Sequence, residues 1–108
     1  LTPTIFDDAP GVVAGVTLRA FAPESAPRDE VRARLGARFG MPVASVGQVH
    51  GALVAVVREA GHVEAHDALV TSQRGLLLTT VAADCALVLL ADPDAGVAGA
   101  CHSGWRGT

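Results

Sequence analysis

The stretch ALVLLADPDAGVAGAC, residues 86–101, contains two short apolar runs separated by a polar turn. The first run is ALVLLA (86–91), the second is GVAGAC (96–101), and the turn begins with DPD at 92–94. Proline presets its own φ, and aspartate side chains bond to nearby backbone N–H groups, so DPD favours a turn. Runs that are apolar throughout are typical of strands covered on both faces. The stretch therefore predicts two buried strands.

The rest of the chain predicts one helix and several more short strands. Residues 25–40 predict the helix, because apolar side chains recur every four residues from Val31 to Phe39. Ser25 is its expected N-cap and Gly40 its expected end. Apolar runs bounded by turn residues predict further strands at 11–20, 44–50, 53–57, 68–71 and 76–81.

These elements predict an α/β fold of the α+β kind, a mixed β-sheet sandwich covered by helices. A sheet with two apolar faces and only one helix to cover them is incomplete. We therefore expect residues 1–108 to form a single domain that is a fragment of a larger one, or to pair with a second chain over an exposed sheet face. Either case predicts a contiguous exposed apolar surface larger than a few hundred Å², which monomers rarely have.

Composition and charge exclude several classes of function. The formal net charge of −3 argues against binding to a nucleic acid polymer or a membrane surface, since either needs a basic face. No apolar run is long enough to span a bilayer. The first ten residues lack the basic and apolar segments of a signal peptide. With only 2 cysteines, a disulfide scaffold is not expected, and we predict a reducing cytoplasm with free thiols or thiolate ligands.

Three residues that can carry chemistry stand where predicted strands end or turn: His50, Cys85 and His102. Two imidazoles and one thiolate supply three zinc ligands and leave a fourth position open for water or substrate, as in catalytic zinc sites. Alternatively, Cys85 is a nucleophile and His102 its base, without a metal. Two ordinary polar histidines and a buried cysteine explain the same residues. Their spacing alone leaves these interpretations open.

Four other residues are candidates of a weaker kind. Cys101 is expected to be buried and to make no metal contact, because it neighbours His102 on a strand and points to the opposite face. His62 and His66 lie in an expected polar loop and are predicted to be solvated. Arg106, in the segment SGWRG, can hold an anion such as phosphate together with backbone N–H groups. From spacing alone, a turn with a packed tryptophan is the better explanation of that segment.

Four segments of the chain resemble a known family: QVHG (48–51), DALVT (67–71), ADCALVLLADP (83–93) and HSGWRGT (102–108). They are similar to the purine nucleoside phosphorylase family once called the laccase-domain or multicopper polyphenol oxidase family, which includes peptidoglycan editing factors. The segments occur in the family's order and cover the chain from about residue 44 to its end. The resemblance implies an α/β sandwich with a mixed sheet, in a domain about twice the length of this chain.

The resemblance also implies roles for individual residues. His50, Cys85 and His102 fall on the family's three zinc ligands, and Arg19 corresponds to an arginine near the phosphate and the nucleoside. The implied function is zinc-dependent phosphorolysis of adenosine, inosine or methylthioadenosine, with adenosine deamination as a further activity. The implied partners are a purine nucleoside and phosphate. The alternatives are a metal-free Cys–His hydrolase, with Cys85 and His102 as catalytic residues, and a non-catalytic binding domain or inactive fragment.

The amino-acid composition argues against the oxidase activity that the family's older name suggests. A four-copper oxidase needs many histidines and a cysteine copper site, often with an axial methionine. The chain has 4 histidines and 1 methionine, which cannot build such a centre. A single copper ion bound in place of zinc at the same ligands is compatible with the sequence.

Overall fold

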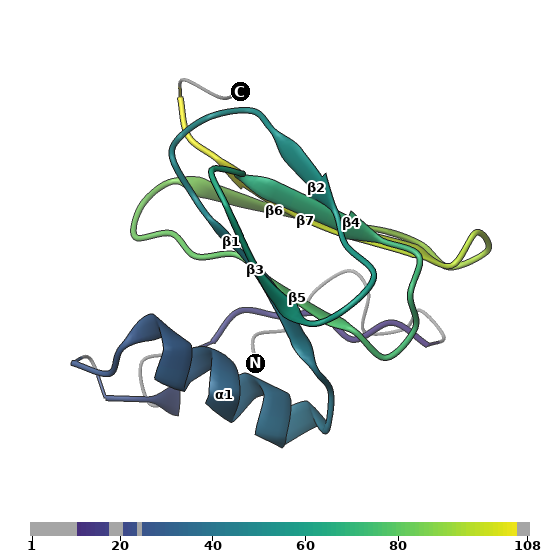
Figure 1. Cartoon of the computed structure of the whole chain (residues 1–108), viewed down its shortest axis with the longest axis horizontal. Coiled ribbons are helices and arrows are strands. Elements are labelled where there is room, and N and C mark those ends of the chain that lie inside the picture. Colours follow the sequence, from purple (N-terminus) through teal and green to yellow (C-terminus); the bar gives the residue numbers. More distant parts are fainter. Residues whose placement is uncertain (1–10, 18–20, 24, 106–108) are drawn as a thin grey trace.

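The computed structural model describes residues 11–17, 21–23 and 25–105, which form one helix and two small sheets (Figure 1). Figure 1 shows the helix on one side of the molecule and the largest strands on the other. In chain order the elements are α1 (Arg28–Phe39), β1 (Val43–Gly47), β2 (Val54–Val56), β3 (Gly61–Glu64), β4 (Ala68–Thr71), β5 (Leu77–Thr79), β6 (Ala86–Asp92) and β7 (Val97–Ser103).

The two sheets have different topologies. The first has the strand order β3-β1-β5, and both of its pairs are parallel. The second has the order β2-β4-β7-β6, in which β2 and β4 are parallel and the other two pairs are antiparallel. The turn at 92–94 joins β6 directly to β7 as an antiparallel pair. The expected α+β fold with a mixed β-sheet sandwich is confirmed, with one helix packed against β1 (Figure 1).

The hydrophobic core lies between the two sheets. The first sheet contributes Ala44 and Val46, and the second contributes Ala55, Leu69 and Ala100. The last three are register partners across β2, β4 and β7, so they point to the same face of the second sheet. This inner face of the second sheet is therefore closed by the first sheet.

Helix α1 ends as predicted but begins later than predicted. Gly40 adopts the left-handed conformation at φ 63° and ψ 36°, which suits a residue without Cβ. At the other end, the helix starts at Arg28, its N-cap is Pro27, and no side chain caps it. Ser25 as N-cap is therefore wrong, because the N-cap position falls two residues later, on Pro27. The carbonyl of Pro27 accepts the N–H of Glu30 instead.

The prediction that β6 is covered on both faces is wrong, since its burial alternates along the strand. Val88 and Leu90 are 40% and 62% exposed. By the strand register they share one face of the second sheet with Val54 and Val56, which are 55% and 67% exposed. We call these four side chains the outer face. An exposed apolar sheet face is what the sequence predicted, but it belongs to one side of the sheet only.

Two further expectations about strands are corrected. Residues 11–17 of the expected strand 11–20 form no strand, and residues 18–20 lie outside the described residues. Conversely, β3 forms in the segment expected to be a polar loop. Whether a strand forms depends in both cases on hydrogen bonds to a neighbouring strand. β3 pairs with β1 along its whole length, whereas residues 11–17 have no strand pairing in the described structure.

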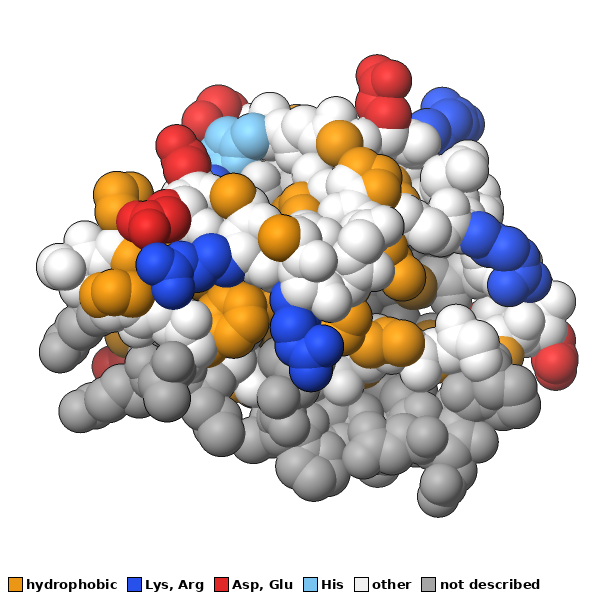
Figure 2. Space-filling view, turned by 90° about the horizontal axis from the view of Figure 1, so that it is seen from below, with side chains coloured by type: hydrophobic (Ala, Val, Ile, Leu, Met, Phe, Trp, Pro, Cys, Tyr) orange, Lys and Arg blue, Asp and Glu red, His pale blue; other side chains and the backbone are white. Residues whose placement is uncertain are grey.

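Apolar side chains also gather between arginines on the side of the molecule that carries α1 (Figure 2). A cavity of about 550 Å³ lies there, lined by apolar residues of α1 and the sheets, among them Leu35, Phe39, Leu76 and Leu89. None of the candidate metal ligands lines it. Among the described residues, no helix has the length and apolar character needed to cross a membrane.

Candidate metal centre

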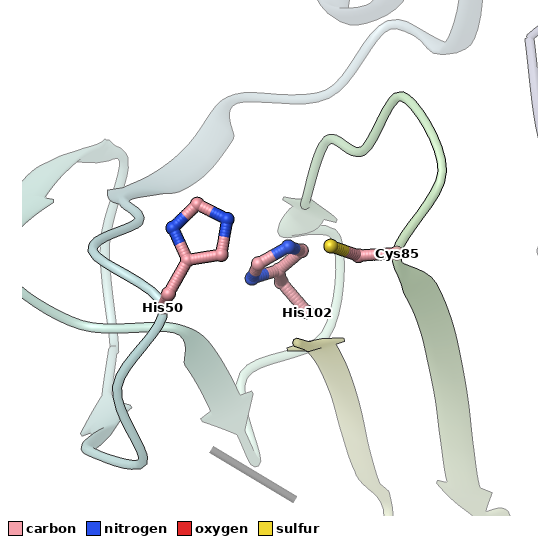
Figure 3. Close-up of side chains that lie close together, drawn as sticks. All are labelled: His50, Cys85 and His102. Carbon is pink, nitrogen blue, oxygen red and sulfur yellow. The ribbon is translucent and has the colours of Figure 1, made fainter. Parts of the chain in front are cut away.

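His50, Cys85 and His102 converge at one place, as the sequence predicted (Figure 3). Their candidate ligand atoms all lie within 4.8 Å of one another. The exposed His50 follows β1, the half-buried Cys85 directly precedes β6, and the buried His102 lies on β7. The three side chains therefore come from three separate segments, and the sandwich brings them together at one end of its strands.

The loop that carries His50 is anchored by a carboxylate that the sequence analysis did not single out. Asp67 Oδ1 accepts the backbone N–H groups of Val49 and Gly51 at 3.0 and 2.9 Å. Its Oδ2 accepts the backbone N–H of His50 at 3.0 Å. His50 itself has φ 60°, a left-handed conformation that is uncommon for residues other than glycine. This left-handed residue allows three successive N–H groups to face one side chain.

The same aspartate holds His102. The two residues form a hydrogen bond between Asp67 Oδ2 and His102 Nδ1 at 2.8 Å, with side chains 2% and 3% exposed. The backbone N–H of His102 also donates to the Asp67 carbonyl at 2.7 Å. The imidazole rings of His50 and His102 then meet edge to face, with centroids 5.1 Å apart. One side chain thus positions both histidines.

The charge state of Asp67 follows from opposing effects. Burial by itself would raise the pKa of this carboxyl group. The hydrogen bond with His102 and those from the N–H groups of Val49, Gly51 and His50 together lower the pKa below its usual value. Near neutral pH Asp67 is therefore an anion that can only accept hydrogen bonds. Consequently Nδ1 of His102 is the donor in their hydrogen bond, and in the neutral ring the lone pair lies on Nε2.

A second side chain, Gln48, ties the end of β1 to the segment that leads to Cys85. Its Nε2 donates to the Val81 carbonyl at 2.6 Å, and its Oε1 accepts the Val81 N–H at 2.8 Å. Because both amide atoms of Gln48 are used, the spacing between the His50 loop and the Cys85 segment is fixed at this point. Gln48 and Asp67 lie in the motifs QVHG and DALVT, but their residue types alone assigned them no role.

The remaining candidates do not join this cluster. Cys101 does not belong to the group of candidate ligands, as expected. Its side chain is half-buried, whereas the sequence predicted a buried one, because Cys101 lies on the partly exposed face of the second sheet. His62 lies on β3, where its Nδ1 is 2.7 Å from Ser45 Oγ and its Nε2 is 3.2 Å from Glu64. It is exposed, as predicted, although on a strand. His66 is half-buried, so the prediction that it is solvated holds only in part.

The predicted anion-binding residues cannot be placed. Arg19 and Arg106 both lie outside the described residues. Trp105, in the segment SGWRG, is 82% exposed, so the expectation of a packed tryptophan is wrong, although Trp105 does lie in a turn.

Residues 24–108 match the family described as multi-copper polyphenol oxidoreductase laccase. The chain belongs to this family. The resemblance that its four motifs carried is thereby confirmed. A protein of Deinococcus radiodurans named purine nucleoside phosphorylase is 46% identical to it over 101 residues, which cover 91% of this chain and 40% of that protein. Purine nucleoside phosphorylase ORF3 of Streptomyces griseus is 47% identical over 83 residues, covering 70% and 34%.

Solved structures of related proteins have the same fold. The crystal structure of YlmD from Geobacillus stearothermophilus superposes with a TM-score of 0.67 at 31% identity, over 81% of this chain and 38% of that one. Neisseria meningitidis protein NMB0706 superposes with a TM-score of 0.63 at 30% identity, over 80% and 35%. The chain therefore spans between about a third and two fifths of the length of these four relatives.

Proposed function

We propose that this chain carries the metal-binding part of a zinc-dependent purine nucleoside phosphorylase of the cytoplasm. The observation that carries the proposal is the convergence of His50, Cys85 and His102, in a chain whose relatives are named purine nucleoside phosphorylase. Its substrates are a purine nucleoside, such as inosine, adenosine or methylthioadenosine, and phosphate. Arg19 and Arg106 are the residues that we assign to phosphate or nucleoside binding.

The three side chains fit zinc in number and in kind. A catalytic zinc ion takes three protein ligands, at about 2.0–2.1 Å for nitrogen and 2.3 Å for sulfur, and keeps one position open. Ligand atoms of a tetrahedral site are therefore roughly 3.3–3.6 Å apart. The candidate atoms, within 4.8 Å of one another, need to approach by about 1 Å or a little more. Copper also accepts imidazole and thiolate and is the expected substitute.

In this proposal the residues of the chain have the following roles. His50, Cys85 and His102 hold the ion, Cys85 as its thiolate, and the hydrogen bond from Nδ1 to Asp67 directs Nε2 of His102 toward it. When bound, zinc supplies positive charge that stabilises negative charge developing on the substrate. Phosphorolysis also needs phosphate directed at C1′ of the sugar, which we assign to the arginines. Deamination of adenosine is the alternative reaction at such a site.

A metal-free cysteine hydrolase is the second candidate, and one observation favours it. Asp67, His102 and Cys85 are arranged in the order carboxylate, imidazole, thiol, the order that orients and activates a nucleophile in catalytic triads. In that case His102 Nε2 would accept the proton of the Cys85 thiol. The two candidates use the same atoms and differ in whether a metal is required.

Metal analysis combined with turnover separates these functions. Zinc content and the conversion of inosine and phosphate to hypoxanthine and ribose 1-phosphate are measured for the 108-residue chain and for any longer gene product that contains it. We expect one zinc per chain, and turnover in the longer product that a chelator removes and zinc restores. Little turnover is expected from the 108 residues alone. Turnover that survives chelation and is lost on alkylation of Cys85 would favour metal-free chemistry at Cys85 and overturn the proposed zinc dependence.

Gly104 offers a way to disturb the site without removing a ligand. A Cβ there would lie 3.1 Å from Cδ2 of His50, so Gly104→Ala forces the two groups apart by a few tenths of an ångström. We expect zinc affinity to fall several-fold, measured by competition with a chromogenic chelator. The matched control is Gly51→Ala in the same site, whose Cβ meets its nearest neighbours at an ordinary 3.6 Å. Equal effects of the two substitutions would contradict this reading of the site.

We further propose that the outer face is covered by more polypeptide, either a second chain or further residues of a longer product. Four aliphatic side chains exposed together on one sheet face favour association in water. We expect the purified 108-residue chain to self-associate, and the double substitution Val56→Glu with Leu90→Glu to reduce its apparent mass by light scattering. Glu59→Gln, which changes the charge at an exposed position outside the outer face, serves as the charge control. A wild-type chain that stays monomeric at high concentration would contradict the proposal.

A further inference from the structure

We infer that Asp67 is a positioning residue that prepares both histidines of the candidate metal centre in the absence of metal. The inference rests on the proposed function in that it assigns the site to a metal. It goes beyond that function because it concerns a residue that is no ligand itself. The proposed role has two parts: fixing which nitrogen of His102 carries the proton, and fixing the backbone of the His50 loop.

The hydrogen-bonding capacity of the Asp67 carboxylate is fully used. Each oxygen accepts two hydrogen bonds: Oδ1 from the N–H groups of Val49 and Gly51, and Oδ2 from the N–H of His50 and Nδ1 of His102. The residue is 1% exposed, so water does not compete for these positions. Four donors around a carboxylate match its four lone-pair sites. The arrangement leaves no freedom for the side chain to rotate without losing a bond.

For His102, this arrangement selects one of the two neutral tautomers. A carboxylate can only accept, so in the neutral imidazole the hydrogen sits on Nδ1 and the lone pair on Nε2. A carboxylate behind a metal-binding histidine is the usual way in which proteins orient such a ring and raise its basicity. The backbone N–H of His102 donates to the Asp67 carbonyl at 2.7 Å, which fixes the two residues along the strand pair as well.

For His50, the arrangement stabilises a conformation that the residue would not adopt by itself. A non-glycine residue at positive φ costs on the order of 1 kcal/mol or more. At φ 60° the N–H groups of Val49, His50 and Gly51 all face the Asp67 carboxylate. Successive N–H groups curved around an anion form a known kind of anion-binding concavity. The negative charge of Asp67 therefore holds the loop in the shape that places the His50 ring against that of His102.

The first test needs no substitution. The tautomer of His102 is read from long-range ¹⁵N–¹H NMR spectra of the metal-free, full 108-residue protein near neutral pH. In the neutral ring we expect a protonated Nδ1 and a bare Nε2. A neutral ring with its proton on Nε2 and none on Nδ1 would overturn the inference, whatever the protein does with zinc. The outcome is thus independent of the proposed function, which fails separately if the protein binds no zinc.

The second test is Asp67→Asn, which keeps the shape of the side chain and removes its charge. Its NH₂ group would face at least one donor, so we expect the Nδ1 proton of His102 to be lost in part and zinc affinity to fall about 10- to 100-fold. Binding of Co²⁺ adds a spectroscopic readout, because its visible absorption reports the coordination geometry. We expect that spectrum to change. Unchanged zinc affinity and an unchanged cobalt spectrum would overturn the inference.

Asp92→Asn is the matched control for a merely structural effect. Asp92 Oδ1 also accepts backbone N–H groups, from Asp94 and Ala95 at 3.1 Å, but in a turn without a histidine partner. We expect this variant to change thermal stability slightly and to leave zinc affinity, the cobalt spectrum and the His102 tautomer unchanged. If Asp92→Asn lowered zinc affinity as much as Asp67→Asn, a general loss of structure would explain both and the inference would be wrong.

Discussion

Cys85→Ser is expected to abolish stoichiometric zinc binding. The substitution exchanges a thiolate for a hydroxyl group that stays protonated near neutral pH and is a poor zinc ligand. Loss of a residue behind the ligands typically costs about 10- to 100-fold in metal affinity, and loss of a ligand should cost more. We therefore expect a drop of more than about 100-fold. Zinc content after dialysis and the sulfur-to-metal charge-transfer band of the Co²⁺ form measure it.

Cys101→Ser is the control for this prediction. The two cysteines are both half-buried and free, and the same atom is changed in each. Cys101 pairs with Val88 and Ala68 in the second sheet and does not belong to the metal group. We expect its replacement to leave zinc content and the charge-transfer band unchanged. If Cys85→Ser kept one zinc per chain, or if Cys101→Ser lost it, the assignment of ligands would be wrong.

The second large effect concerns the core. Leu69 is 1% exposed and packs among the small side chains between the two sheets. Leu69→Ala is expected to lower the free energy of unfolding by about 2–5 kcal/mol, since it removes buried methyl groups and leaves a cavity. The free energy of unfolding of a domain is only about 5–15 kcal/mol, so a loss of this size should unfold much of the protein at moderate temperature. Urea denaturation followed by circular dichroism measures the change.

Leu90→Ala makes the same chemical change at a position that is 62% exposed. At protein concentrations low enough for the chain to be monomeric, we expect it to shift the free energy of unfolding by no more than about 0.5 kcal/mol, as exposed substitutions usually do. A cost as large as that of Leu69→Ala would mean that the outer face is buried in solution. Its dependence on protein concentration would then show whether a second copy covers it. A small cost for Leu69→Ala would contradict the placement of the core.

Local elements were predictable where neighbouring residues decide them. The apolar period from Val31 to Phe39 predicted α1, and Gly40 ended it because glycine adopts the left-handed conformation at no steric cost. The run at 68–71 predicted β4 with the observed bounds. Residue propensities gave the wrong prediction where strand pairing determines the structure. The polar β3 was expected to be a loop and forms because β1 supplies its hydrogen bonds.

By itself, the sequence determined the helix, most of the strands, the family and the three side chains at the candidate centre. These depend on residue types and on their order, which a chain carries without folding. Only the tertiary structure decided which strand face is exposed and that Asp67 anchors the site. The bonds of Asp67 to the His50 loop span 16 to 18 residues, and its bond to His102 spans 35. Hydrogen bonds have short range and strict direction, so such pairs exist only once packing has brought the donors to the carboxylate.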